Sequence, residues 1–184
     1  MVDRATMLPY PDPPLEDGLV RLRRWEERDL ACVRAAATDP RIPSGTTVPA
    51  NYSEAEGMAF IERQWGRQCE GQGLSLAIEE AATRTAVGLI ALLFRPEPLV
   101  VGLGYWVIPE ARGRGFASRA IALLSPWALH QASVRRVEAF VDPTNAASIG
   151  ALEGFGFQRE GLLRSYLRGT QDVFIYSLLP SDLE

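Results

Sequence analysis

The sequence predicts a mixed α/β fold in which helices flank a largely antiparallel sheet. Segments with strand-like alternation interchange with segments of helical periodicity along the chain. Several neighbouring strand patterns are separated by short polar turns, as in antiparallel hairpins. The 184 residues, 47% hydrophobic and 23% charged, suit one ordinary folded domain.

Residues 1–17 differ from the rest in their proline content. They contain Pro9, Pro11, Pro13 and Pro14, and prolines at this density cannot sustain a helix or a central strand. We therefore expect an extended, proline-rich leader over 1–17 and a single domain over 18–184.

The first part of that domain combines one strand with two helices. Residues 19–25 alternate as a half-buried strand, and 27–38 have helical periodicity. Ser53, with Glu56 three residues later, is typical of a capping box that opens a second helix. On its inner face we expect Met58, Ile61 and Trp65.

Three strands follow. Residues 74–79 and 85–94 flank the polar turn 80–84 with the spacing of a hairpin, and 100–108 reads as the next strand. A glycine-rich turn over 112–115 then opens a long apolar helix that is predicted to run to about residue 131.

The last part of the chain adds a strand, a short helix and the final strands. The strand is predicted over 137–141 and the helix over 145–153. Phe157 and residues 173–179 supply the final strands, with 159–172 expected as a loop.

Composition excludes several classes of function. The net charge of −4 and the lack of a free Lys/Arg block argue against binding to nucleic acid or to an anionic membrane surface. Cys32 and Cys69 are the only cysteines and His130 is the only histidine, so neither a disulfide framework nor a metal site is predicted. No apolar run is long enough to span a bilayer, so we expect a cytoplasmic protein.

The glycine-rich turn has the chemistry of a phosphate site. Gly113 and Gly115 leave backbone N–H groups uncovered at a helix N-terminus, where Arg112 and Arg114 add positive charge. By itself, the same pattern also suits an ordinary turn. No G-K-[ST] follows it and the G-x-G-x-x-G spacing is absent, which disfavours nucleotide hydrolysis and dinucleotide redox chemistry.

Two ordered motifs resemble the GNAT acetyltransferases. Residues 112–117, RGRGFA, match the Q/R-x-x-G-x-G/A signature that holds the pyrophosphate of acetyl-coenzyme A in that family. Residues 142–148, DPTNAAS, followed by Gly156 and Phe157, are similar to its N-x-x-S…G-F segment. The resemblance covers about residues 18–180. With Gly104-Tyr105-Trp106, it is closest to the ribosomal-protein N-terminal alanine acetyltransferases.

The resemblance implies a fold and a reaction. The fold is the acyl-CoA acyltransferase fold with a splayed central strand pair. The reaction is transfer of the acetyl group of acetyl-CoA, a cosubstrate used without a metal, to a primary amine in a ternary complex. The acceptor is either a protein N-terminus or a small molecule. The oligomeric state stays open, a homodimer included.

The resemblance also implies roles for named residues. Ser148 supplies the proton to the departing thiolate, and Asn145 contacts the pantetheine arm, although both residue types also suit helix caps. The remaining cofactor-binding candidates lie on the strand or in the turn after it: Trp106, Val107, Ile108, Arg112, Gly113, Arg114, Gly115, Phe116, Ala117 and Ser118. The apolar members among them also suit a plain core.

Two familiar catalytic side chains are missing from their usual places in the family. Leu152 stands where many members have a tyrosine acid, and Gly102 and Leu103 stand where many have a glutamate base. Carboxylates remain at Glu110, Glu138 and Asp172, or a water chain could deprotonate the amine. Two alternatives stay open: a non-catalytic acyl-CoA-binding module, and a transferase of a longer acyl group such as succinyl.

Overall fold

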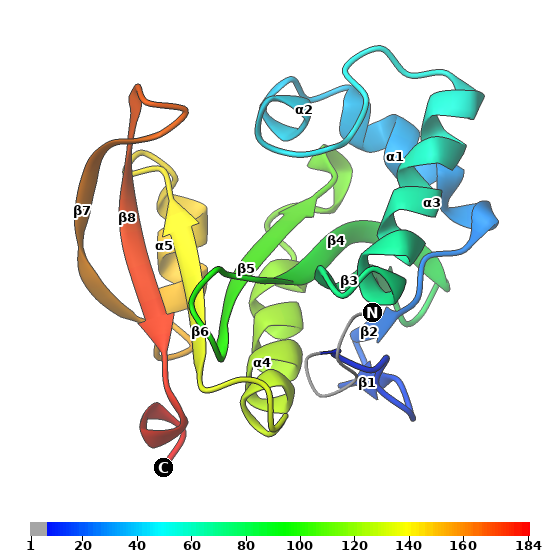
Figure 1. Ribbon diagram of the computed structural model, residues 1–184. Coiled ribbons are helices and arrows are strands. Elements are labelled where there is room, and N and C mark those ends of the chain that lie inside the picture. Colours follow the sequence, from blue (N-terminus) through cyan, green and yellow to red (C-terminus); the bar gives the residue numbers. More distant parts are fainter. Residues whose placement is uncertain (1–6) are drawn as a thin grey trace.

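The computed structural model describes residues 7–184, and its centre is one eight-stranded sheet (Figure 1). The strand order is β1-β2-β3-β4-β5-β6-β8-β7. The β5–β6 pair is parallel, and the other neighbouring strands are antiparallel. The predicted mixed α/β class with a largely antiparallel sheet is confirmed.

The N-terminal segment lies along the first edge of the sheet. Strand β1 (Leu15–Glu16) pairs with β2 (Val20–Arg23), and the side chain of Leu8 is buried in the main core. Part of the expected leader, residues 1–6, lies outside the described residues. Within residues 7–184, no helix is long and apolar enough to cross a membrane.

Helices α1 (Leu30–Ala37) and α3 (Glu54–Cys69) cover one face of the sheet, with the short α2 (Arg41–Gly45) between them in the chain (Figure 1). Ser53 caps α3 as predicted, because its hydroxyl accepts the N–H of Glu56 at 3.2 Å. The predicted inner face was partly wrong. Ile61 is buried, but its buried companions are Gly57, Phe60 and Gln64, whereas Met58 and Trp65 are half-buried.

Strands β3 (Gly73–Glu80), β4 (Thr85–Phe94) and β5 (Val100–Val107) form the middle of the sheet. The predicted hairpin of β3 and β4 is confirmed by their antiparallel register. All of β3 is buried because helices cover both of its faces. Leu74, Leu76 and Ile78 point into the main core, and Ala77 points into the second core beneath α1 and α3.

The opposite face carries α4 (Phe116–Leu129) and α5 (Ala146–Glu153). Helix α4 contributes Phe116, Ala120, Ile121 and Leu124 to the main core, at the spacing of one helix face. Its N-terminus follows β5 through the short 3-10 helix Pro109–Ala111. Figure 1 shows α4 beneath the centre of the sheet and α5 beside β6.

The C-terminal third differs from expectation in one element. Strand β6 (Arg136–Val141) and β8 (Gln171–Leu178) lie close to the predicted ranges. Residues 159–172 were expected as a loop, but most of them form β7 (Gln158–Leu167) and its turn into β8. Strand β7 is the exposed edge of the sheet, so its sequence lacks the apolar alternation of a half-buried strand.

Candidate active site

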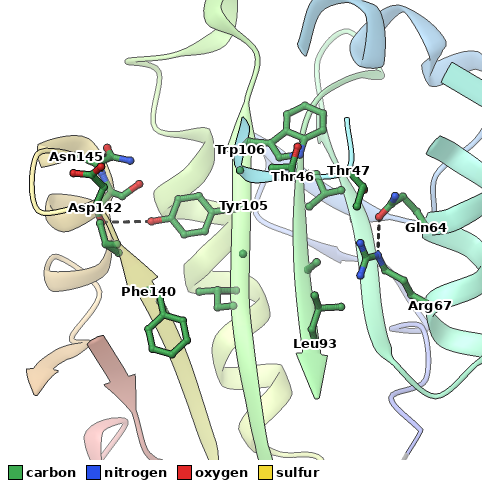
Figure 2. Close-up of a pocket in the computed structure, with 18 of the residues that line it drawn as sticks. Thr46, Thr47, Gln64, Arg67, Leu93, Tyr105, Trp106, Phe140, Asp142 and Asn145 are labelled. Atoms are coloured by element: carbon green, nitrogen blue, oxygen red, sulfur yellow. Dashed lines mark hydrogen bonds between the residues drawn. The ribbon is translucent and has the colours of Figure 1, made fainter. Parts of the chain in front are cut away.

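The parallel pair β5 and β6 separates after three residue pairs. The register joins Val100 to Arg136, Val101 to Val137 and Gly102 to Glu138, and no further pairs follow. The remainder of β5 runs along β4 alone, while the remainder of β6 pairs with β8. The central strands therefore splay, and a gap opens between their C-terminal halves (Figure 2).

A cleft of about 570 Å³ occupies this gap and the sheet surface beside α3. Gly104 lies in its floor, where the lack of a side chain leaves room: a Cβ there would meet no atom of residues 7–184 within 4 Å. The walls come from the loop after α2, from α3, from β4, β5 and β6, from the start of α5 and from the β7–β8 turn. They include Thr46, Thr47, Gln64, Arg67, Tyr105, Trp106, Phe140, Asp142, Asn145, Ser148 and Arg168.

The backbone groups that face the gap belong to alternate residues of β5. The N–H of Ile108 donates to the carbonyl oxygen of Val87 at 2.9 Å, so it points toward β4. Because residues of an antiparallel ladder alternate in direction, the backbone of Trp106 also points toward β4, and that of Tyr105 and Val107 points toward the gap. The free groups here are thus the N–H and C=O of Tyr105 and the N–H of Val107, rather than those of Trp106 and Ile108; the Val107 carbonyl oxygen accepts from Arg112.

Trp106 has a packing role that the sequence left open. Its side chain is only 7% exposed, and its ring centroid lies 6.1 Å from that of Trp25 and 6.3 Å from that of Phe60. This aromatic group belongs to the second core, beneath α3. Trp106 therefore forms a rigid wall of the cleft.

The start of α5 brings Asn145 and Ser148 to the cleft. Asn145 is the N-cap residue, and its side-chain oxygen accepts the N–H of Ser148 at 3.2 Å. The hydroxyl of Tyr105 donates to the backbone oxygen of Ser148 at 3.4 Å, which ties α5 to β5 across the gap (Figure 2). Burial raises the pKa of Tyr105, so this phenol stays protonated at neutral pH. Leu152, one turn further along α5, is fully buried.

The glycine-rich turn presents unused backbone donors at the N-terminus of α4. Gly113 and Gly115 have φ angles of 75° and 82°, in the left-handed region that favours glycine. A Cβ at either position would meet no atom of residues 7–184 within 4 Å, so the turn is open. Phe116, Ala117 and Ser118 form the first turn of the helix, whose N–H groups have no partner within it.

Both arginines of the turn are already paired. Nη1 of Arg112 lies 2.6 Å from Oδ2 of Asp39. The Nε of the same arginine donates to the Val107 carbonyl oxygen at 3.1 Å. Arg114 pairs with Glu80, the last residue of β3. Hydrogen bonds from Arg41 and then from Arg112 hold the pKa of Asp39 below its ordinary value. An anion at the turn would therefore compete with these carboxylates for the arginines.

The structure brings the predicted residues together as two neighbouring groups. Trp106, Asn145 and Ser148 line the cleft, whereas residues 112–118 lie beyond the end of β5 and do not line it. The candidate bases Glu110, Glu138 and Asp172 do not line it either. Glu138 is paired with Arg136 at 2.7 Å, and Asp172 accepts the N–H of Ser165. Within residues 7–184, no three His, Cys, Asp or Glu side chains are grouped as metal ligands.

Sequence reasoning missed several side chains of the cleft, among them Tyr105, Gln64 and Arg67. Tyr105 was noted only as part of a motif, and Gln64 and Arg67 were not singled out, although all three line the cavity. A signal existed for Gln64, since a polar residue three positions after Ile61 falls on the buried side of α3. Nothing in the sequence placed Arg67 in the same cleft as β5, which begins more than thirty residues further along the chain.

Comparison with known proteins gives consistent matches. Residues 20–158 match the acetyltransferase (GNAT) domain family. The chain is 28% identical over 162 residues to the uncharacterised N-acetyltransferase p20 of Bacillus licheniformis, covering 86% of this chain and 91% of that protein.

Two solved structures show the same fold. RimJ of Mycobacterium smegmatis, in complex with CoA-disulfide, has a TM-score of 0.78 and 24% identity, covering 92% of this chain and 87% of that one. The ribosomal-protein-S5-alanine acetyltransferase of Vibrio fischeri has a TM-score of 0.74 and 17% identity, covering 93% and 98%.

Proposed function

The chain belongs to the GNAT acetyltransferase domain family, and from this premise we propose that it transfers the acetyl group of acetyl-CoA to a primary amine by direct attack in a ternary complex. A protein N-terminal α-amine or a small amine is the proposed acceptor. The observation that carries the proposal is the continuity of β5 with the glycine turn: the strand that borders the gap leads directly into the N–H groups at the start of α4.

The glycine turn is the proposed site of the cosubstrate pyrophosphate. The N–H groups of residues 113–118 and the positive end of α4 would attract the phosphates. Arg112 and Arg114 supply the charge that a diphosphate needs, once it displaces Asp39 and Glu80 from them. Phe116, Ala117 and Ser118 then act through their backbone, which explains why their side chains share no chemistry.

The pantetheine arm would follow the gap from the turn toward the cleft. The N–H and C=O groups of Tyr105 and the N–H of Val107 face this gap and can pair with its amide groups as another strand would. On the opposite side, the amide of Asn145 borders the same space. These contacts would place the thioester between β5 and the start of α5.

The chemical step needs a neutral amine and a proton for the leaving group. The amine nitrogen attacks the thioester carbonyl carbon, the C–S bond breaks, and the amine proton leaves to water. Ser148 is the proposed donor of a proton to the thiolate, because it lines the cleft on the first turn of α5. Water then returns a proton to the Ser148 hydroxyl, so that in sum the amine loses one proton and the CoA thiolate gains one. Tyr105 positions that turn through its bond to the Ser148 carbonyl.

An N-terminal α-amine suits a site without a strong base in its wall. Among the charged residues that line the cleft, Asp142 is the single carboxylate in the part of the chain that is described. It accepts hydrogen bonds from Thr144, which lower its pKa, so it is a weak base. An α-amine, whose ordinary pKa is about 7.7–8.0, loses its proton to water more readily than a lysine at about 10.4.

Calorimetry and thiol release together test this function. We expect acetyl-CoA to bind, and free CoA to appear when an acceptor amine is added. Binding without release from any amine in a broad panel would favour a non-catalytic acyl-CoA-binding module. Faster release from succinyl-CoA than from acetyl-CoA would favour a longer acyl donor.

A further inference from the structure

Arg67 stands out among the cleft residues because a second side chain fixes its guanidinium. Its Nε donates to Oε1 of Gln64 at 3.0 Å (Figure 2). Gln64 is only 1% exposed and is itself held at both ends, since its Nε2 donates to the Phe60 carbonyl oxygen and its Oε1 also accepts from Ser75. The direction of the Arg67 guanidinium is therefore set by a buried polar network in α3 and β3.

The guanidinium has no acidic partner within residues 7–184. No carboxylate of these residues lies within 4 Å of it, although the side chain is half-buried. Burial and then the neighbouring Arg63 lower the pKa of Arg67, because both disfavour its charged form. A half-buried charge of this kind is stabilised when an opposite charge pairs with it.

Two further arginines lie in the cleft or beside one of its wall residues. Arg168 lines the same cleft and donates to the backbone oxygen of Ser44. Arg95 lies with its guanidinium 4.7 Å from the ring centroid of Phe140, a cleft residue, and its buried Nε has no hydrogen-bond partner in the described chain. The carboxylate of Asp142 lies on the opposite side of the cleft from Arg67 (Figure 2).

We propose that the acceptor amine carries a carboxylate, and that Arg67 binds this group while the amine enters the gap beside Tyr105. The inference rests on the proposed transfer to an amine and adds a substrate class to it: amino acids, or peptides with an acidic residue near the N-terminus. Arg67 can hold a carboxylate through two parallel N–H···O bonds, because Gln64 occupies only its Nε. A neutral acceptor would leave the cation unpaired.

Matched acceptors test the inference. The probes are the peptides Ala-Glu-Ala-Ala-amide and Ala-Ala-Glu-Ala-amide with their glutamine counterparts, and 3-aminopropanoate with its amide. For at least one pair we expect kcat/KM for CoA release to be about tenfold or more higher for the acid, as charge-assisted hydrogen bonds imply. In Arg67→Gln this preference should vanish, and in Arg67→Lys part of it should remain.

Arg63→Gln is the matched control. Arg63 lies on the same helix, is exposed, and donates to the backbone oxygen of Thr47 rather than lining the cleft. It should keep the preference for acidic acceptors, and Arg67→Gln should keep the affinity for acetyl-CoA. The inference is overturned if Arg67→Gln retains the preference, if Arg168→Gln alone removes it, or if acidic and neutral members of every pair react equally.

Binding of the N-acetylated product peptides separates this inference from the proposed function. Calorimetry measures their affinity without any turnover. Suppose that no amine releases CoA, yet the acetylated acidic peptide binds about tenfold tighter than its glutamine form and Arg67→Gln abolishes the difference. Binding of the carboxylate by Arg67 is then supported, and acetyl transfer is refuted. Equal binding of the acidic and neutral products in the wild type would refute the anion site.

Discussion

Substitution of Gly115 should weaken acetyl-CoA binding while leaving the protein folded. Gly115 is the N-cap residue of α4 with a φ of 82°. An alanine there incurs about 1–2 kcal/mol of left-handed backbone strain, and no steric clash adds to it because no atom of residues 7–184 lies within 4 Å of the new Cβ. For a chain of this size, that strain lowers the Tm by about 2–8 °C.

The effect on binding has a different source. The methyl group would enter the open space that the pyrophosphate should occupy, and would separate a phosphate oxygen from the N–H groups of the turn. Loss of one hydrogen bond to a charged group costs about 1.5–3 kcal/mol, or about 10- to 150-fold in Kd. Gly115→Glu should weaken binding further, because it adds a negative charge beside the phosphates.

The assay is calorimetric titration with acetyl-CoA, combined with thermal unfolding. Gly169→Ala is the matched control, since Gly169 also has a positive φ, of 72°, and free space around its Cβ, but lies in the β7–β8 turn. It should lose similar stability and keep its affinity. Unchanged Kd in both Gly115 variants would refute the placement of the pyrophosphate.

Three further outcomes are expected. Ser148→Ala should lower kcat by about 10²-fold with little change in the Kd of acetyl-CoA, and an unchanged kcat would reduce Ser148 to a structural residue. Glu79→Gln should cost about 1.5–3 kcal/mol in urea unfolding, because it removes a charge-assisted hydrogen bond between the fully buried Glu79 and Arg23, which Asp29 continues to pair; a cost below 0.5 kcal/mol, roughly, would contradict this. Hydrogen bonds from Arg136 and then from Ser177 lower the pKa of Glu160 to about 2. The ionised Glu160 carboxylate therefore stabilises the fold fully above the ordinary carboxyl pKa of about 4.3, and this stabilisation is lost as the pH falls toward 2. The decline of Tm over that window should be smaller in Glu160→Gln than in the wild type.

The sequence predicted the buried centre of the fold better than its edges. Strands β3 and β4 are long and apolar and flank a polar turn, so local pattern and tertiary structure agree. Strand β7 was missed because it is the exposed last strand, whose pairing with β8 is decided by backbone hydrogen bonds rather than by side-chain burial. On α3, Met58 was expected inside, but the helix turns the face of Phe60 and Gln64 toward the sheet.

For the candidate site, the sequence predicted local features but not the contacts between segments that are far apart in the chain. Gly113 and Gly115 predicted a turn with free N–H groups, because glycine adopts positive φ angles whatever its distant neighbours are. The pairing of Arg112 with Asp39 and the approach of Arg67 to the cleft join segments far apart in the sequence. Such contacts depend on the strand order, which periodicity does not determine.

The most direct test of the account is titration of the purified protein with acetyl-CoA, followed in the same sample by free-thiol release on addition of acidic and neutral N-terminal peptides. We expect saturable binding that Gly115→Glu weakens, and thiol release that depends on the acceptor amine. If acetyl-CoA does not bind, the assignment of the turn and the gap to this cosubstrate is contradicted.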